Sequence, residues 1–183
     1  LEAKLIESKK LNKLPKVIIP VHFSGYPCDM SKIYKLSKKY NFKIIEDASH
    51  AIGSKYKHLK KDIKIGSCKH SHITIFSFHP VKIITTGEGG AALTNNKKLA
   101  SKMKIFRTNG ITRNQKEMVK KPEGPWYYQQ IYLGFNYRLN DIEAALGISQ
   151  LKRIKYFLNR RNKIEKYYDS HLKNLPLNIP FRK

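Results

Sequence analysis

The fold of this chain is decided by the stretch Thr74-Ile-Phe-Ser-Phe-His-Pro-Val-Lys-Ile-Ile-Thr-Thr-Gly-Glu-Gly-Gly90. It begins within an apolar run rich in β-branched residues, Ile73 to Phe76, which predicts a buried strand. The run breaks at a proline and passes Lys82. The glycine-rich end then leads into a second apolar run, Ala91-Ala-Leu93. We therefore expect a buried strand followed by a loop that carries Lys82.

Lys82 is a lone lysine between Val81 and two isoleucines. An apolar environment disfavours an ammonium ion, so a lysine held there becomes a usable amine nucleophile toward a carbonyl group. Ser77, at the end of the predicted strand, offers a hydroxyl group to an anion. From these residues alone the alternative stays open, because lone lysines are mostly exposed. In that alternative the stretch is a surface hairpin and Lys82 is merely solvated.

The preceding residues predict a strand–helix–strand unit. Residues 16–21 are expected to form a short buried strand, Asp29 is a suitable N-cap for a helix, and residues 42–45 form the next strand. This order favours a parallel sheet. It places Asp47 at the carboxyl edge of the sheet, where α/β folds bind ligands. A turn or helix cap explains an aspartate at this position equally well.

The remaining segments are predicted more coarsely. Helical patterns cover residues 1–15, 97–106 and 140–172. Asn95-Asn96 begins the second helix and Asn140-Asp141 caps the third, which continues or restarts near Asn159. Irregular structure is expected over residues 51–70, an ordered aromatic loop over 107–132 and an extended tail over 176–181.

The composition limits the functional classes. The chain has 183 residues, of which 40% are apolar, which is enough for one domain with a core. Its net charge of +24 would suit an acidic partner such as nucleic acid. The lysines are spread along helical faces, however, without an arginine-rich block. We therefore favour a solvated lysine-rich surface and expect no nucleic-acid partner.

The other compositional signals point to the cytoplasm. Cys28 and Cys68 lack metal-ligand spacing and are expected as thiols of a reducing compartment. The histidines also lack such spacing, so no metal site is expected. No signal peptide opens the chain and no apolar run is long enough to span a bilayer. We expect a cytoplasmic protein without a membrane partner.

The ordered segment Ser77–Gly90 resembles the lysine segment of the DegT/DnrJ/EryC1/StrS family of sugar aminotransferases, which use pyridoxal 5′-phosphate (PLP). Residues 20–27, 45–53 and 133–147 match the family in the expected order. The resemblance implies an α/β fold: a fragment of the large domain of a fold-type I PLP-dependent transferase, with a mostly parallel sheet and flanking helices. It also implies the long helix that leads to a small domain.

Family members are about twice as long as this chain. By resemblance, residues 1–139 are a partial PLP-binding large domain without its N-terminal part. Residues 140–183 are then linking helices toward a small domain that is mostly missing. The N-terminal part would contain the loop that holds the cofactor phosphate at a helix N-terminus.

The resemblance also implies roles for individual residues. Lys82 is the catalytic lysine that bonds to the cofactor, Asp47 meets the pyridine nitrogen, and Ser77 contacts the phosphate. His50 replaces the usual glutamine beside the phenolic oxygen. Asn136 reaches the phosphate of the neighbouring subunit, which implies a homodimer. Three further residues are expected either to contact the substrate or to lie behind the residues that do: His79, Tyr137 and Arg138.

The implied activity is PLP-dependent transamination of a nucleotide-linked keto-deoxysugar to an amino sugar. The resemblance suggests a UDP-linked 4-keto sugar and L-glutamate as the amino donor. Dehydratase relatives carry histidine in place of the lysine, so Lys82 favours the transaminase. Two alternatives stay open from the sequence: an inactive fragment of such an enzyme, and a basic nucleic-acid-binding module.

Overall fold

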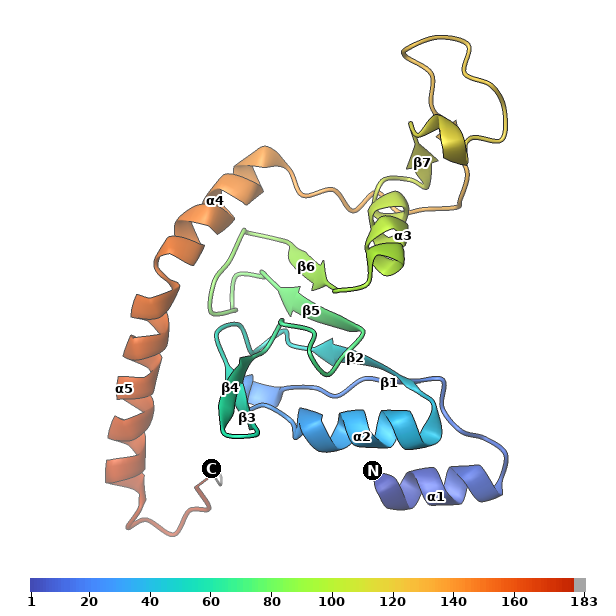
Figure 1. Ribbon diagram of the computed structural model, residues 1–183. Coiled ribbons are helices and arrows are strands. Elements are labelled where there is room, and N and C mark those ends of the chain that lie inside the picture. The colour runs from blue at the N-terminus through green and yellow to red at the C-terminus, as the bar shows by residue number, and fades with distance from the viewer. Residues whose placement is uncertain (180–183) are drawn as a thin grey trace.

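The computed structural model of the protein describes residues 1–179 and contains a four-stranded sheet with the order β1-β2-β5-β6 (Figure 1). Its strands are β1 (Val17–Ile18), β2 (Lys43–Asp47), β5 (Ile73–Ser77) and β6 (Gly90–Leu93). β2 runs parallel to both β1 and β5, whereas β6 is antiparallel to β5. The predicted α/β class with a mostly parallel sheet is confirmed.

Helix α2 (Met30–Tyr40) connects β1 to β2 and completes the predicted strand–helix–strand unit. The side chain of Asp29 caps it by accepting from the backbone N–H of Lys32, and Asn41 ends it in the left-handed conformation. Helices α1 (Glu2–Lys10) and α2 lie on the same side of the sheet (Figure 1). One buried cluster joins α1, α2 and β2: Leu5, Met30, Tyr40, Phe42 and Ile44.

Side chains alternate along β2, and this alternation positions the site. Ile44 and Glu46 are buried on the face that α2 covers, whereas Ile45 and Asp47 are only half-buried on the opposite face. Asp47 lies in register with Ile75 of β5, which is largely exposed. The carboxyl end of β2 therefore presents Asp47 on the more open face of the sheet.

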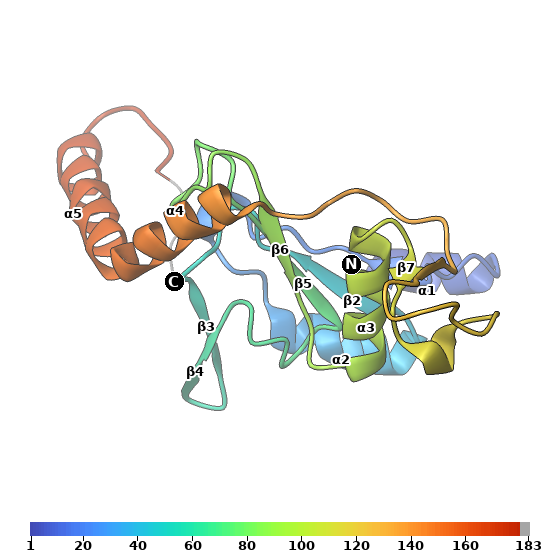
Figure 2. The ribbon, with the colours of Figure 1, turned by 90° about the horizontal axis from the view of Figure 1, so that it is seen from above.

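Two expectations about the strands were wrong. Residues 55–64 are not irregular, because β3 (Lys55–His58) and β4 (Lys61–Lys64) form an antiparallel hairpin that projects from the sheet (Figure 2). Its turn residues, Leu59 and Lys60, take left-handed conformations that Asn-Gly usually supplies, so no residue pair typical of a hairpin turn marks this position. β1 is also not buried, because it is two residues long and lies at the sheet edge.

The segment after β6 is ordered. Helix α3 (Lys97–Arg107) is capped by the side chain of Asn96, as the sequence predicts. The long loop after it contains a small sheet, β7 (Ile111–Thr112) with β8 (Gln129–Gln130), and a short 3-10 turn, η2 (Gln115–Glu117). The aromatic loop is therefore ordered as expected, although its strands were not predicted.

Two helices end the described chain. Asn140 caps α4 (Asp141–Lys152), as the sequence predicts, and Glu143 completes a capping box that was not predicted. The helix breaks at Arg153, rather than near Asn159, and continues as α5 (Ile154–Leu172). The expected tail begins without regular structure over 177–179, and its last residues lie outside the described part.

The apolar side chains of α4 do not form a buried face in this chain. Ile142 is 85% exposed, and Leu146 and Leu151 are also exposed. Only Gly147 is buried, where an added Cβ would press against the methyl group of Thr86. The helix therefore contacts the sheet domain through its glycine and leaves its large apolar side chains uncovered.

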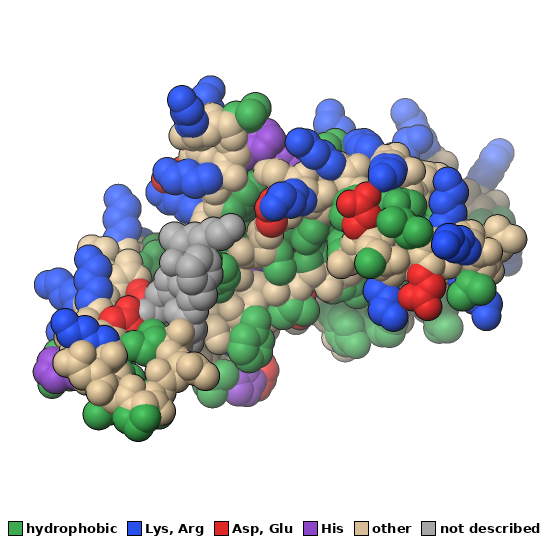
Figure 3. All heavy atoms as spheres, turned by 90° about the horizontal axis from the view of Figure 1, so that it is seen from below, with side chains coloured by type: hydrophobic (Ala, Val, Ile, Leu, Met, Phe, Trp, Pro, Cys, Tyr) green, Lys and Arg blue, Asp and Glu red, His purple; other side chains and the backbone are tan. Residues whose placement is uncertain are grey.

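Positive charge covers the surface broadly. In Figure 3, lysine and arginine side chains are distributed across the visible face and are not gathered in one groove. Within residues 1–179, no helix combines the length and apolarity needed to cross a membrane.

Two glycines with similar backbone conformations allow a matched test of the aromatic loop. Gly110 has φ +71° and packs directly against the backbone of Tyr132, whereas Gly87 has φ +83° with open space around it. Gly87→Ala should lower the free energy of unfolding by about 1 kcal/mol through backbone strain alone. Gly110→Ala should lower the free energy of unfolding by roughly 2 kcal/mol more than Gly87→Ala does, because its methyl group would overlap the Tyr132 carbonyl. Urea denaturation of both variants measures the difference, and equal losses would contradict this packing.

Candidate active site

Lys82 lies in the loop that connects the antiparallel strands β5 and β6. Backbone bonds from Phe78 N to Gly89 O (2.8 Å) and from Thr86 N to Phe78 O (3.0 Å) close the loop at its base. Within it, Lys82 N donates to His79 O at 3.0 Å. The loop therefore has a defined backbone conformation around the lysine.

The apolar environment predicted for Lys82 is only partly present. Ile84 is buried and Lys82 itself is half-buried, but Val81 is 73% exposed. The difference arises because neighbouring loop residues point in different directions. One side of the lysine faces the body of the protein and the other is open.

Ser77 and His79 form the first turn of this loop. The hydroxyl oxygen of Ser77 accepts from the backbone N–H of His79 at 3.4 Å, and His79 Nδ1 accepts from the N–H of Val81 at 3.4 Å. His79 Nε2 lies 3.9 Å from the carboxylate of Glu88. An acceptor at Nδ1 leaves the proton of neutral His79 on Nε2, which faces Glu88.

Asp47 ends β2, and its Oδ1 accepts from the backbone N–H of Ser49 at 3.0 Å. This hydrogen bond lowers the pKa of the Asp47 carboxyl, burial opposes the lowering, and smaller electrostatic effects from the side chains of His50 and Lys82 add to it. Asp47 is therefore ionised at neutral pH. β2 and β5 are parallel neighbours, and the Lys82 loop leaves the end of β5, so the structure places Asp47 and the Lys82 loop at the same edge of the sheet.

His50 lies at the next turn. Its Nδ1 accepts from the backbone N–H of Ser24 at 3.3 Å, and its ring packs edge-on against Phe23. These partners belong to η1 (Phe23–Gly25), the 3-10 turn after β1. Gly25 has φ +81° and approaches the His50 carbonyl so closely that a side chain would collide with it. A neutral His50 in this arrangement carries its proton on Nε2.

The predicted residues Asn136, Tyr137 and Arg138 lie on a different segment and are exposed. Asn136 pairs with Thr108 at the end of α3, and Tyr137 N donates to Arg107 O at 2.9 Å. Asp47, His50 and Lys82 thus belong to the sheet edge, whereas these three residues belong to the strand-like segment that leads into α4.

A buried polar group beneath Asp47 was missed from the sequence. Glu46 accepts hydrogen bonds from His22, Ser71 and Thr74. Burial opposes the charged form of Glu46, but these hydrogen bonds outweigh burial and lower its pKa. The available signal was a glutamate at an inward position of β2, two residues after buried Ile44.

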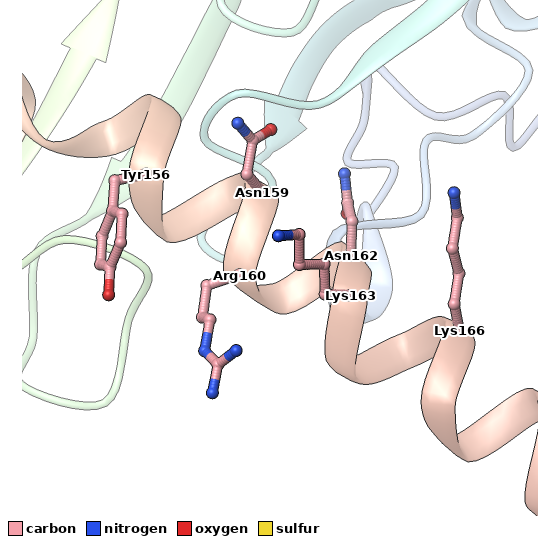
Figure 4. A pocket seen from close by; sticks show the side chains of 6 residues that line it. All are labelled: Tyr156, Asn159, Arg160, Asn162, Lys163 and Lys166. Carbon is pink, nitrogen blue, oxygen red and sulfur yellow. The ribbon is translucent and has the colours of Figure 1, made fainter.

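Two hollows on the described surface are lined by none of these residues. The hollow in Figure 4 is lined by six side chains of α5, which fan out to both sides of the helix and do not converge: Tyr156, Asn159, Arg160, Asn162, Lys163 and Lys166. Another hollow lies between α3 and the segment around Ile131. Within the described residues, no group of three or more His, Cys, Asp or Glu side chains could hold a metal ion.

An α/β sheet with an ionised aspartate at one strand end and a lysine in a neighbouring loop is the arrangement of the PLP-dependent aminotransferases. The chain belongs to the DegT/DnrJ/EryC1/StrS aminotransferase family, whose sequence profile matches residues 1–183. This confirms the resemblance predicted from the lysine segment. Aminotransferases of this family depend on PLP.

Individual relatives support the assignment. A UDP-4-amino-4,6-dideoxy-N-acetyl-beta-L-altrosamine transaminase of Campylobacter jejuni is 46% identical over 149 residues, which are 81% of this chain and 36% of that protein. The structure of Helicobacter pylori PseC, an aminotransferase of pseudoaminic acid biosynthesis, matches with a TM-score of 0.77 and 34% identity, covering 94% of this chain and 43% of that one. The chain thus spans about two fifths of the relatives' length.

A further structural relative connects the fold to the cofactor. The PLP form of Spr1654 from Streptococcus pneumoniae matches with a TM-score of 0.69 and 29% identity, covering 87% of this chain and 42% of that one. The residues present here fit PLP chemically. The chain supplies an ionised carboxylate at Asp47, a primary amine at Lys82 and a hydroxyl group at Ser77.

The electrostatic coupling between Lys82 and Asp47 can be measured directly. Lys82→Met should raise the pKa of Asp47, because it removes one of the charges that lower it. The native pKa lies below the ordinary value of 3.8, so ionised Asp47 adds stability above that pH. This contribution is lost as the pH falls through the native pKa. NMR titration of the Asp47 carboxyl carbon measures the shift.

Lys102→Met on α3 is the matched control, because it removes an equal charge from a distant helix. It should leave the Asp47 titration unchanged. An unchanged midpoint in Lys82→Met, or equal shifts in both variants, would show that Lys82 and Asp47 do not face one another.

Proposed function

We propose that this chain carries the cofactor-bonding lysine and the ring-nitrogen carboxylate of a PLP-dependent transaminase. The observation that supports this most strongly is the register of β2 with β5, which pairs Asp47 with Ile75, two residues before the Ser77 that opens the Lys82 loop. An amine and a carboxylate so placed can engage opposite ends of one aromatic ring. PLP, when bound, acts as an electron sink that stabilises negative charge on the carbon of the amino donor.

The residues of this chain have distinct roles in the proposal. Lys82 would hold the cofactor at its carbonyl carbon, and its amine would move a proton at the donor carbon as general base and then general acid. Asp47 keeps the pyridine nitrogen protonated. Ser77 donates its hydroxyl group to the phosphate, and His50 offers its Nε2–H to the phenolic oxygen, because Ser24 occupies Nδ1.

His79 is the nearest candidate for a substrate contact. Its backbone carbonyl accepts from the N–H of Lys82, and its Nε2 is exposed beside Glu88. A substrate hydroxyl or phosphate group could therefore meet this imidazole close to the reacting amine. We assign Tyr137 and Arg138, on the exposed segment before α4, to contacts with the substrate or with the residues around it.

The proposed substrate is a nucleotide-linked keto-deoxysugar that is aminated, with a UDP-linked 4-keto sugar and L-glutamate as the specific pair. The UDP-altrosamine transaminase name of the Campylobacter relative supports the sugar class, and a GDP-perosamine synthase of Caulobacter vibrioides is also 39% identical. Both names denote nucleotide-sugar chemistry. The net charge of +24 favours capture of such polyanionic substrates.

We also propose a cytoplasmic homodimer in which Asn136 serves the phosphate site of the partner. The exposed position of Asn136, on a segment apart from Asp47, suits a role outside its own site. The uncovered apolar side chains around it supply a surface that association could bury: Leu133, Phe135, Tyr137, Ile142 and Leu146. In this proposal residues 1–139 form the PLP-binding part and residues 140–183 the helices leading away from it.

Borohydride reduction provides the test of Lys82. In the full-length gene product saturated with PLP, reduction should fix the cofactor on the peptide that contains Lys82, and mass spectrometry identifies it. Lys82→Ala should lose the adduct and at least about a thousandfold in transamination rate, because the lysine performs both bonding and proton transfer. Lys102→Ala serves as the control. Retained transamination in Lys82→Ala would refute the assignment.

Subunit complementation tests the shared site. Lys82→Ala and Asn136→Ala homodimers should each be weakly active. Random mixing yields heterodimers with one intact site of two, so about a quarter of the wild-type sites should return. Activity of the mixture that equals the average of the two parents would indicate that Asn136 acts within its own subunit or not at all.

A further inference from the structure

Beneath the strand end that carries Asp47 lies a fully buried pair, His22 and Glu46. Their exposed fractions are 0% and 2%, and His22 Nε2 lies 2.8 Å from Glu46 Oε2. The other carboxylate oxygen of Glu46 accepts from the hydroxyl groups of Ser71 and Thr74. The pair therefore connects β2, β5 and the loop after β1.

The hydrogen bonds fix the proton of His22. The backbone N–H of Cys28 donates to Nδ1 at 3.1 Å, so Nδ1 carries a lone pair and the proton lies on Nε2. That proton is donated to Glu46. The imidazole thus has one orientation and one tautomer, and it links two backbone segments through a buried carboxylate.

A buried carboxylate adds little net stability to a sheet, because its charge must be removed from water. Removing a charge from water costs several kcal/mol, and packed apolar side chains of similar volume are often as stable or more so. All buried side-chain N and O atoms among the described residues have hydrogen-bond partners, so the cost is offset here by a complete network. Such networks are suited to fixing one arrangement of neighbouring segments.

The segment fixed by His22 holds the backbone of Asp47. His22 N donates to Asp47 O at 3.0 Å, and Asp47 N donates to Pro20 O at 2.9 Å. His22 thus bonds Asp47 through its backbone and Glu46 through its ring. On the other side, Ala48 N donates to Ile75 O at 2.8 Å, which joins the same strand end to β5.

We propose that His22 and Glu46 are positioning residues that hold Asp47 in place for the ring nitrogen of the cofactor. Neither side chain meets the cofactor, because side-chain alternation puts Glu46 on the face opposite Asp47. This inference rests on the proposed function. A merely structural network would support the whole core and would not affect Asp47 selectively.

Four substitutions separate positioning from stability. His22→Asn keeps an acceptor for Cys28 N–H but cannot reach Glu46, whereas His22→Gln restores a donor to Glu46. Thr74→Val is the matched control, since it removes a hydrogen bond from the same carboxylate but lies on β5, away from residues 20–22. Glu46→Gln keeps the size of the Glu46 side chain but removes its charge, so it weakens the hydrogen bond from His22. This variant is used in place of His22→Asn if His22→Asn does not fold.

Three quantities are compared in the full-length protein: the free energy of unfolding, the PLP dissociation constant, and amide hydrogen exchange at Asp47 without PLP. His22→Asn should weaken PLP binding roughly tenfold and speed Asp47 exchange by a similar factor, the effect of one charge-assisted hydrogen bond. Thr74→Val should lower the free energy of unfolding about as much as His22→Asn, but it should change neither PLP binding nor Asp47 exchange. His22→Gln should recover both, and Glu46→Gln should show them more weakly.

Equal effects of His22→Asn and Thr74→Val on exchange and PLP binding would overturn the inference, as would unchanged Asp47 exchange in His22→Asn. The exchange measurement needs no cofactor, so it shows whether His22 and Glu46 hold the Asp47 backbone in place even if the wild-type protein binds no PLP. Absence of PLP binding by the wild type would instead refute the proposed function. The two failures are therefore distinguishable.

Discussion

The structure depends on the side-chain alternation of one short strand, β2. Ile44 and Glu46 must point into the layer beneath α2, so Ile45 and Asp47 must point to the other face. A shift of one residue in the pairing with β1 or β5 would exchange these faces. It would bury Asp47 in the apolar cluster and expose the polar pair, so the core and the proposed site are specified together.

The loop between β5 and β6 carries Lys82, and its position depends on the pairing of these two strands. Antiparallel pairing of β5 and β6, closed at Phe78, Thr86 and Gly89, fixes both ends of a loop that projects Lys82 at the sheet edge. β2 and β5 are parallel neighbours, so their carboxyl ends meet at this edge. Asp47 and the loop that carries Lys82, 35 positions later in the sequence, are thereby brought to the same edge of the sheet.

Local signals in the sequence predicted much of this arrangement. The caps at Asp29, Asn96 and Asn140, together with the run at Ile73, located the main helices and β5, because capping and burial are short-range effects. The hairpin around Leu59 escaped prediction since its turn residues adopt left-handed conformations against their preference. The two-residue strands β7 and β8 exist because Gly110 allows a close backbone approach, which no periodic pattern reveals.

The site was predicted from motifs, whereas its support was not. Lys82 stood out by its aliphatic neighbours and Asp47 by its position at a predicted strand end, whereas His50 was expected only from the family resemblance. His22 and Glu46 are 24 positions apart, and their contact depends on the crossover through α2. The aliphatic environment expected around Lys82 was inferred from chain neighbours, but Val81 points to solvent. Tertiary placement decided these features.

The central claim is that ionised Asp47 faces the ring nitrogen of a cofactor held by Lys82. The most direct measurement is the ¹⁵N chemical shift of ring-labelled PLP bound to the full-length protein and to its Asp47→Asn variant at neutral pH. A protonated ring nitrogen is expected in the wild type and a neutral one in the variant. The same protonation state in both proteins would contradict the central claim.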